Sequence, residues 1–185
     1  MSSSSVVVVT GASSGIGRVA AEIFVARGCR VFGTVRDLRK APVVPGVEFV
    51  EMDVREEESV QAGIDSIIEQ GLRIDVLVNN AGMMMLGAVE ETATAEAAAL
   101  FDTNVFGVLR VTRAVLPSMR KQHRGRIVNV SSLFGVMPAP YMGMYAAAKH
   151  ALEGLSESLD HEVRQFGVRV TLVQPAFTRT NLDIN

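Results

Sequence analysis

Short runs of branched apolar residues alternate with longer segments of helical pattern along the whole chain. Six runs have the composition of strands: residues 6–10, 30–35, 47–53, 75–80, 126–132 and 169–175. Segments long enough for helices lie at 15–27, 57–70, 94–122 and 145–166. Because parallel neighbouring strands need a long crossover, which a helix supplies, this order predicts a doubly wound α/β fold with a Rossmann-like parallel sheet.

The bulk properties of the chain exclude several classes of protein. Its 185 residues are enough for one domain, and 48% hydrophobic with 21% charged residues is typical of a folded globular protein. The net charge of −2 offers no basic surface to nucleic acid. No apolar run approaches the roughly 18 residues of a membrane helix. The first residues also lack a signal-peptide pattern, so we expect a cytoplasmic protein without a membrane span.

The stretch TGASSGIG at 10–17 joins the first strand to the first helix. Its glycines allow a tight turn and a close approach of phosphates to the backbone N–H groups at the helix N-terminus. We therefore predict a dinucleotide site formed by Gly11, Ser13, Ser14, Gly15, Ile16 and Gly17. A tight turn without a ligand is the alternative, since the spacing G-x-x-x-G-x-G differs from the commoner G-x-G-x-x-G.

The end of the second strand indicates which dinucleotide would bind. This position contacts the adenosine ribose in doubly wound sheets, and an acid there binds the ribose hydroxyls. The chain instead has Val35 followed by Arg36, whose guanidinium suits a 2′-phosphate. The sequence thus favours NADP(H) over NAD(H). The alternative is that Arg36 is a loop charge paired with Asp37.

A second group of residues indicates acid-base chemistry. YAAAK at 145–149 places Tyr145 and Lys149 on one face of a helix. A tyrosine phenol has an ordinary pKa of about 10, and a nearby ammonium favours its phenolate, so the pair can donate and accept a proton. Ser132 ends the preceding strand at the edge where ligands of such sheets bind, so its hydroxyl can contact a substrate oxygen.

Two other chemistries have weaker support. A serine nucleophile at Ser132 would need a G-x-S-x-G elbow and a partner histidine, and the chain has neither pattern. The histidines His123, His150 and His161 share no metal-ligand spacing, so no metal is predicted.

Together these residues resemble the short-chain dehydrogenase/reductase family over essentially the whole chain. The motifs occur in order: the TGASSGIG turn, Asp53-Val54, NNAG at 79–82, NVFG at 104–107, Ser132, YAAAK, and PAFTRT at 175–180. The resemblance implies that residues 1–185 form one NAD(P)-binding Rossmann domain that carries both the cofactor and the catalytic residues.

The resemblance also implies a role for each matching position. Tyr145 would be the general acid in carbonyl reduction and the base in alcohol oxidation. Lys149 would lower the pKa of that tyrosine and bind the nicotinamide ribose. Ser132 would orient the substrate oxygen, and Asn104 would hold a water that relays protons to Lys149. Further cofactor contacts would come from Arg36, Asp53 at the adenine ring, Val54, Asn80, Ala81, Gly82, Pro175 and Thr180.

Two features depart from the family pattern. The usual Pro-Gly after the sixth strand is Pro175-Ala176 here, which would shift the nicotinamide carboxamide slightly, with Thr180 available to contact it. The sequence ends at Asn185, whereas family members continue with a lid helix pair and a seventh strand. We therefore expect the protein to continue beyond Asn185.

Methionines concentrate near the predicted catalytic edge. Six of the nine follow the fourth and fifth strands: Met83, Met84, Met85, Met137, Met142 and Met144. Their flexible, polarizable side chains can line an adaptable apolar pocket, which favours a hydrophobic ketone or secondary alcohol as the small-molecule substrate. Ordinary filling of the core is the alternative.

Small residues are frequent in the segments 94–122 and 145–166. Such residues let helices pack closely, and in the family the corresponding helices pair across a two-fold axis. The resemblance therefore implies a homodimer or homotetramer.

The sequence thus predicts an NADP-dependent oxidoreductase that interconverts a ketone and a secondary alcohol by hydride transfer with a Ser-Tyr-Lys-Asn set. A catalytically silent NADP(H)-binding regulatory protein is the alternative from another class, although such a protein has no need of all four residues. Sugar-nucleotide epimerase chemistry shares the tyrosine and lysine, but usually has another glycine spacing and a longer chain.

Overall fold

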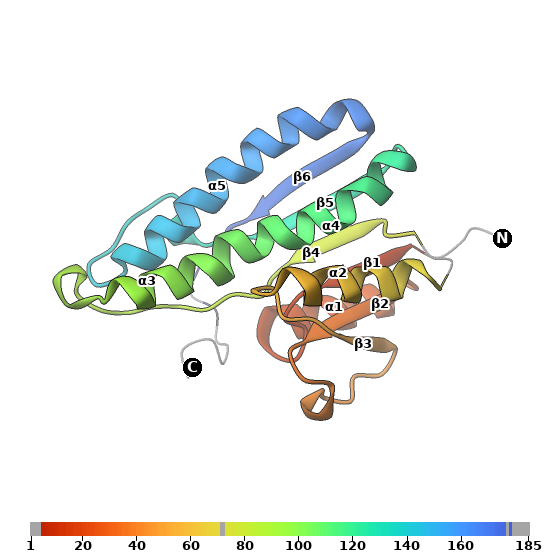
Figure 1. Cartoon of the computed structure of the whole chain (residues 1–185), viewed down its shortest axis with the longest axis horizontal. Helices are drawn as coiled ribbons and strands as arrows, with labels where there is room; N and C mark the ends of the chain where they lie inside the picture. The colour runs from red at the N-terminus through yellow and green to blue at the C-terminus, as the bar shows by residue number, and fades with distance from the viewer. Residues whose placement is uncertain (1–4, 71–72, 177, 179–185) are drawn as a thin grey trace.

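The structure is a computed structural model, which describes residues 5–70, 73–176 and 178. Six strands form one parallel sheet in the order β3-β2-β1-β4-β5-β6 (Figure 1). Their bounds are β1 Val6–Val9, β2 Arg30–Val35, β3 Val47–Glu51, β4 Val76–Asn79, β5 Gly125–Val130 and β6 Val168–Val173. The predicted α/β fold with a Rossmann-like parallel sheet is therefore confirmed.

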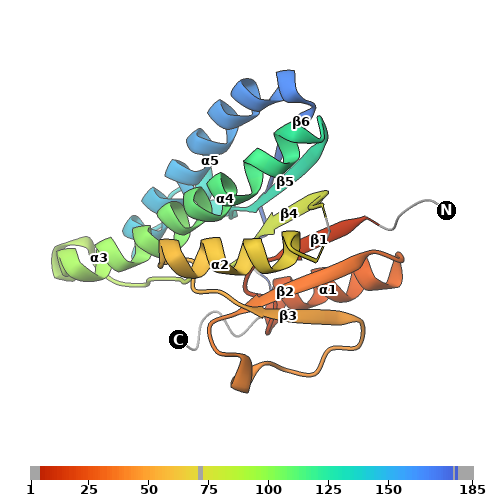
Figure 2. The same ribbon diagram turned by 45° about the vertical axis from the view of Figure 1, so that its right-hand side comes forward.

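Helices cover both faces of this sheet (Figure 2). Helix α1 (Gly15–Ala26) lies on one face, and α2 (Glu57–Ile68), α4 (Gly107–Lys121) and α5 (Gly143–Val163) lie on the other. Strand β1 shows why both faces are apolar: Val6 and Val8 belong to the core under α2 and α4, whereas Val7 and Val9 belong to the core under α1. A strand buried on both faces has no polar side, which explains the unbroken valine run.

The strand order places a ligand crevice at the centre of the sheet. Strand β1 pairs with β2 on one side and with β4 on the other, so the direction of winding reverses between β1 and β4. The connections after these two strands leave the carboxyl edge in opposite directions, and ligands of open α/β sheets bind in the resulting gap. The glycine turn after β1 lies at this point.

The predicted helix at 94–122 is interrupted. Helix α3 spans Thr94–Phe101, the π-helical turn η3 spans Asp102–Phe106, and α4 begins at Gly107, whose N–H donates to the carbonyl of Asp102. A π turn adds one residue to a helix without ending it, so the spacing of apolar residues before and after the turn remains helical. The sequence pattern therefore does not show the interruption.

None of the helices within the described ranges combines the length and the apolar character needed to cross a membrane.

Candidate functional site

The turn between β1 and α1 requires glycine at defined positions. Gly11 and Gly15 have φ angles of +65° and +56°, in the left-handed region that favours glycine. A Cβ on Gly11 would lie 2.9 Å from the Cα of Ala81, and a Cβ on Gly17 would collide with the side chain of Asn80. The turn therefore packs directly against the segment that follows β4.

Hydrogen bonds fix that contact. Thr10 Oγ1 accepts from the backbone N–H groups of Asn80 and Ala81 at 2.9 and 3.0 Å. The side-chain amide of Asn80 donates in return to the carbonyls of Thr10 and Gly11 at 3.0 and 3.2 Å. The amide of Asn80, predicted as a cofactor contact, thus shapes the glycine turn itself.

The N-terminus of α1 fits a diphosphate. Ser14 is its N-cap, and its side chain makes no hydrogen bond to the first turn of the helix. Ser13 and Ser14 are exposed, whereas Gly17 is buried against the sheet and Ile16 is half-buried. Uncapped N–H groups at the positive end of a twelve-residue helix, flanked by two exposed hydroxyls, are the donor set that phosphates use.

At the end of β2, the exposed Arg36 is followed by an aspartate that is held in an ion pair. Asp37 accepts from Arg39 Nε at 2.9 Å and from Arg39 Nη2 at 3.0 Å, and these bonds hold the pKa of Asp37 below its ordinary value. Arg36 is exposed beside this pair. The ion pair of Asp37 is therefore formed with Arg39 and not with Arg36.

Asp53, the predicted adenine contact, is also engaged. Its carboxylate forms an ion pair with Arg55 at 2.6 Å, which lowers its pKa, and Arg36 adds a smaller lowering. Its neighbour Val54 is buried, and a Cβ on Gly107 would lie 2.9 Å from Val54 Cγ2. An adenine ring would have to share the carboxylate of Asp53 with Arg55.

Ser132 caps the short turn η4 (Leu133–Gly135) that follows β5. Its Oγ accepts from the N–H of Phe134 at 3.2 Å, which leaves the hydroxyl hydrogen to be donated elsewhere. The carbonyl of Pro175 accepts from the N–H of Leu133 at 3.0 Å. The ends of β5 and β6 therefore meet at Ser132.

Tyr145 and Lys149 lie in the first turns of α5, close to the end of β5 and the turn that follows it. Lys149 Nζ donates to the carbonyl of Val130, the last residue of β5, at 2.9 Å. The same Nζ lies 5.7 Å from the centre of the Tyr145 ring. Tyr145 is buried and meets the ring of Phe134 edge-on, with centroids 6.2 Å apart. Lys149 therefore contacts the end of β5, and Tyr145 contacts the turn that Ser132 caps.

Burial lowers the pKa of Lys149. Removal from water lowers the pKa of its ammonium from 10.5 to about 8, and the negative charge of Glu153 opposes part of this lowering. The lysine is therefore mostly charged at neutral pH and loses its proton in the mildly alkaline range.

Asn104 occupies the π turn η3 and is buried. Its Oδ1 accepts from the N–H of Met83 at 2.9 Å, and its Nδ2 donates to the carbonyl of Met83 at 2.8 Å. A Cβ on Gly82 would lie 3.2 Å from the same Oδ1. The side chain of Asn104 thus fixes the loop after β4, and the water relay implied by the family resemblance would have to use its backbone carbonyl.

Sequence reasoning missed a buried polar chain beneath the site. Asn79 Nδ2 donates to Thr112 Oγ1 at 3.2 Å and to Asn129 Oδ1 at 2.8 Å. Asn129 Nδ2 in turn donates to Ser156 Oγ at 2.8 Å. These bonds lock β4, β5, α4 and α5 together. A signal was available, because Asn129 is a polar residue between the apolar Val128 and Val130 of β5.

Five of the six predicted pocket methionines gather around Tyr145. Met142 is buried in the same cluster as Tyr145, and Met83, Met84, Met85 and Met144 pack against that cluster. Met137 is exposed.

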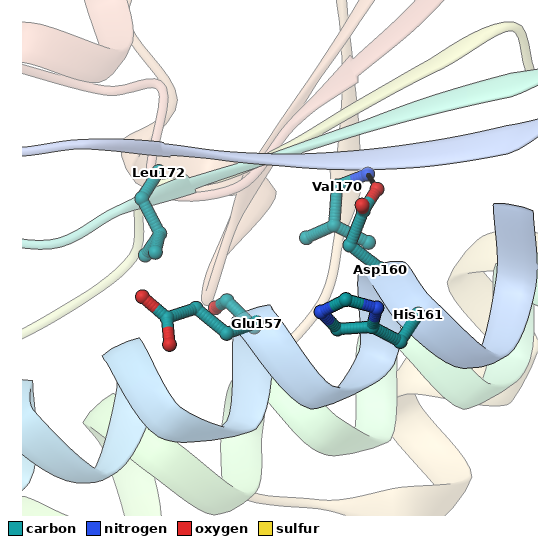
Figure 3. A pocket seen from close by; sticks show the side chains of 6 residues that line it. Glu157, Asp160, His161, Val170 and Leu172 are labelled. Atoms are coloured by element: carbon teal, nitrogen blue, oxygen red, sulfur yellow. Dashed lines mark hydrogen bonds between the residues drawn. The ribbon is translucent and has the colours of Figure 1, made fainter.

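A groove between α5 and β6 is separate from this group. Glu157 and His161 of α5 face Val170 and Leu172 of β6 (Figure 3). Asp160 is committed to Arg164 and Arg169 by ion pairs of 2.8 and 2.9 Å. Across the described part of the chain, no three His, Cys, Asp or Glu side chains form a group that could hold a metal ion.

Comparison with known proteins identifies the family. The family model described as short chain dehydrogenase matches residues 5–185. The chain belongs to this family. Its members include a 3-ketodihydrosphingosine reductase of Bacteroides thetaiotaomicron, 42% identical over 97% of this chain and 66% of its own length. Estradiol 17-beta-dehydrogenase 1 of Rattus norvegicus is 39% identical over 92% of this chain and 53% of its own length. The prediction of an oxidoreductase family is confirmed.

Solved structures of the short chain dehydrogenase family superpose closely on the chain. A short-chain dehydrogenase from Streptomyces avermitilis has 43% identity and a TM-score of 0.92, covering 98% of this chain and 69% of its own. ElxO with NADP bound has 32% identity and a TM-score of 0.93, with coverage of 98% and 77%. A family member from Burkholderia phymatum in complex with NAD has 35% identity and a TM-score of 0.88, with coverage of 97% and 68%.

The short chain dehydrogenase relatives are longer than this chain, which spans 66% and 53% of the two curated proteins above. The predicted contact Thr180 lies outside the described residues.

Proposed function

We propose that the protein interconverts a ketone and a secondary alcohol by hydride transfer with NADP(H), and that Tyr145 is the proton donor and acceptor. The observation that carries the proposal is the position of Lys149 Nζ, 5.7 Å from the centre of the Tyr145 ring. A buried positive charge so close to a phenol favours the phenolate, as a tyrosine that releases its proton near neutral pH requires.

In this proposal, three side chains have separate roles in the reaction. Ser132 donates its hydroxyl hydrogen to the substrate oxygen and orients it. Tyr145 gives its proton to that oxygen in the reductive direction and removes it in the oxidative direction. Lys149 stabilises the phenolate that reduction leaves on Tyr145. When bound, the nicotinamide cofactor supplies or accepts the hydride at the substrate carbon.

The preference for NADP(H) rests on Arg36. Its exposed guanidinium suits a 2′-phosphate, and the pairing of Asp37 with Arg39 offsets the negative charge that would repel one. The solved relatives do not decide the question, since one holds NADP and another holds NAD.

A hydrophobic substrate is supported by the methionines around Tyr145. The names of the two curated relatives, a reductase of a 3-keto compound and a 17-beta-dehydrogenase of estradiol, agree with a ketone or an alcohol as the reacting group. Met142→Ala and Met144→Ala should lower the rate for bulky ketones more than the rate for small ones. Unchanged relative rates would argue for core filling.

A homodimer or homotetramer is part of the proposal. Exposed small residues occur on α3 (Ala98 and Ala99) and on α5 (Ala147 and Gly154), and small side chains allow close packing of a second copy. Sedimentation that shows only monomer at micromolar concentration would contradict the assembly. The cytoplasmic location stays a prediction from the sequence.

Reduction of a panel of aliphatic and aromatic ketones with NADPH tests the central step. Tyr145→Phe should reduce turnover by at least about 100-fold with NADPH affinity retained, because only the proton donor is lost. Tyr141, the second tyrosine of the chain, is exposed, so Tyr141→Phe is the matched control with normal turnover. Tight NADPH binding without turnover by the wild type would support the regulatory alternative.

A further inference from the structure

A second charged group is buried one helical turn beyond Lys149. Glu153 of α5 is 8% exposed, and its Oε2 accepts from Gln174 Nε2 at 2.9 Å. Its Oε1 is buried and has no hydrogen-bond partner among the described residues. A buried carboxylate with one unsatisfied oxygen is costly, and such a group needs a compensating charge or a function.

The turn after β5 encloses this carboxylate. A Cβ on Gly135 would lie 2.8 Å from Glu153 Oε1 and 2.6 Å from Ser131 Oγ, so the absence of a side chain at Gly135 makes room for the acid. Ser131 Oγ is likewise buried without a partner among the described residues. Glu153 is therefore fixed directly behind the turn that carries Ser132.

The compensating charge is the ammonium of Lys149. Residues four apart lie on the same face of a helix, so Glu153 and Lys149 are neighbours on α5. Each is held by its own hydrogen bond, Lys149 to the carbonyl of Val130 and Glu153 to Gln174. Both side chains are buried, so water screens the interaction between the two charges little.

We propose that Glu153 is a positioning residue that keeps Lys149 protonated beside Tyr145, with Gln174 and the Gly135 turn holding its carboxylate in place. The importance of this role for turnover rests on the proposed function. The interaction between the two charges does not, because it exists in the protein without substrate or cofactor.

Other charges near α5 do not substitute for Glu153. The elements packed against α5 carry Glu96 on α3, Asp102 on η3, Arg164 on η5 (Arg164–Phe166) and Arg169 on β6. Each is engaged elsewhere: Glu96 accepts from a backbone N–H, Asp102 pairs with an arginine of α4, and both arginines pair with Asp160. The charge of Glu153 opposes the lowering of the Lys149 pKa that burial causes.

Carbon-13 NMR of lysine-labelled protein tests the proposal directly. The chain has three lysines, so the signal of Lys149 is assigned by its loss in Lys149→Met, and Lys40 and Lys121 are internal references. Glu153→Gln should lower the pKa of Lys149 by about one unit, which at pH 8 raises its neutral fraction from about half to about nine-tenths.

Three further variants complete the test. Glu157→Gln removes an exposed carboxylate one turn further along α5 and should leave Lys149 unchanged. Glu153→Asp keeps the negative charge, so the pKa of Lys149 in this variant should be close to that in the wild type. If Glu153→Gln does not fold, Glu153→Leu, an apolar residue of similar size, should give the same lowering. An unchanged pKa of Lys149 in either folded, uncharged variant would overturn the proposal.

The pH profile of turnover gives a second readout that a merely structural role would not move. The alkaline limb of kcat/KM for ketone reduction should shift to lower pH in Glu153→Gln, with kcat near pH 6 retained. Absence of turnover in the wild type would refute the proposed function alone, because the NMR titration still decides the role of Glu153.

Discussion

Replacement of Lys149 by methionine should make the protein more stable at neutral pH and less stable at high pH. Lys149→Met keeps an unbranched apolar stem and removes the buried charge. The lowering of the Lys149 pKa from 10.5 to about 8 corresponds to a penalty of about 3 kcal/mol for holding the ammonium in the folded protein. Loss of the 2.9 Å bond to the carbonyl of Val130 costs about 1 kcal/mol. The variant should therefore gain about 2 kcal/mol at pH 7.

The dependence on pH has a definite sign. Below pH 8 the folded and unfolded chains both hold the Lys149 proton, so the full penalty is present. Between pH 8 and 10.5 the folded chain releases the proton before the unfolded chain does, so the wild type gains stability as pH rises. Lys149→Met lacks this gain, and the stability difference should reverse near the upper end of the window.

Urea unfolding of both proteins at pH 7 and at pH 10 measures this difference, and titrating groups remote from Lys149 cancel in the comparison. Thermal unfolding should show a rise in Tm of several degrees for the variant at pH 7. Lys121→Met, which removes an exposed lysine of α4, is the control and should give a small difference that is the same at both pH values. A difference between Lys149→Met and the wild type that does not change with pH would refute the assigned burial of the charge.

Three further substitutions test other parts of the site. Gly17→Ala would collide with Asn80 and should weaken NADPH binding by more than about tenfold, whereas Gly87→Ala, which meets nothing within 4 Å, should leave a fluorescence titration unchanged. Arg36→Ala should lower the affinity for NADPH by about tenfold without affecting NADH, as read by thermal shift with each cofactor, and an equal loss for both would contradict a 2′-phosphate contact. Asn129→Ala breaks the buried polar chain and should cost about 2 to 3 kcal/mol in urea unfolding, whereas a loss within experimental error would mean that its partners find others.

The sequence was sufficient to predict the architecture, because strands and helices differ in their pattern of apolar residues. Buried parallel strands are continuously apolar, as in the valine run of β1, and crossover helices separate them. The carboxyl ends of the strands were predicted up to two residues too long. The π turn around Asn104 was not predicted, because an added helical residue leaves the neighbouring pattern intact.

The chemistry of the site was only partly accessible from sequence. Spacing places Tyr145 and Lys149 on one helical face, and the structure adds the hydrogen bond of Lys149 to the carbonyl of Val130 at the end of β5. Side-chain partners depend on the packing of distant elements. The bonds from Asn104 to Met83 and the enclosure of Glu153 therefore have no signature in local sequence.

A fluorescence titration of the purified chain with NADPH and then with NADH tests most directly whether the glycine turn and Arg36 form an NADP(H) site. The account predicts that NADPH binds at least about tenfold more tightly, a difference of about 1.4 kcal/mol. Tighter binding of NADH would contradict the assignment of Arg36 to a 2′-phosphate, and binding of neither cofactor would contradict the dinucleotide site itself.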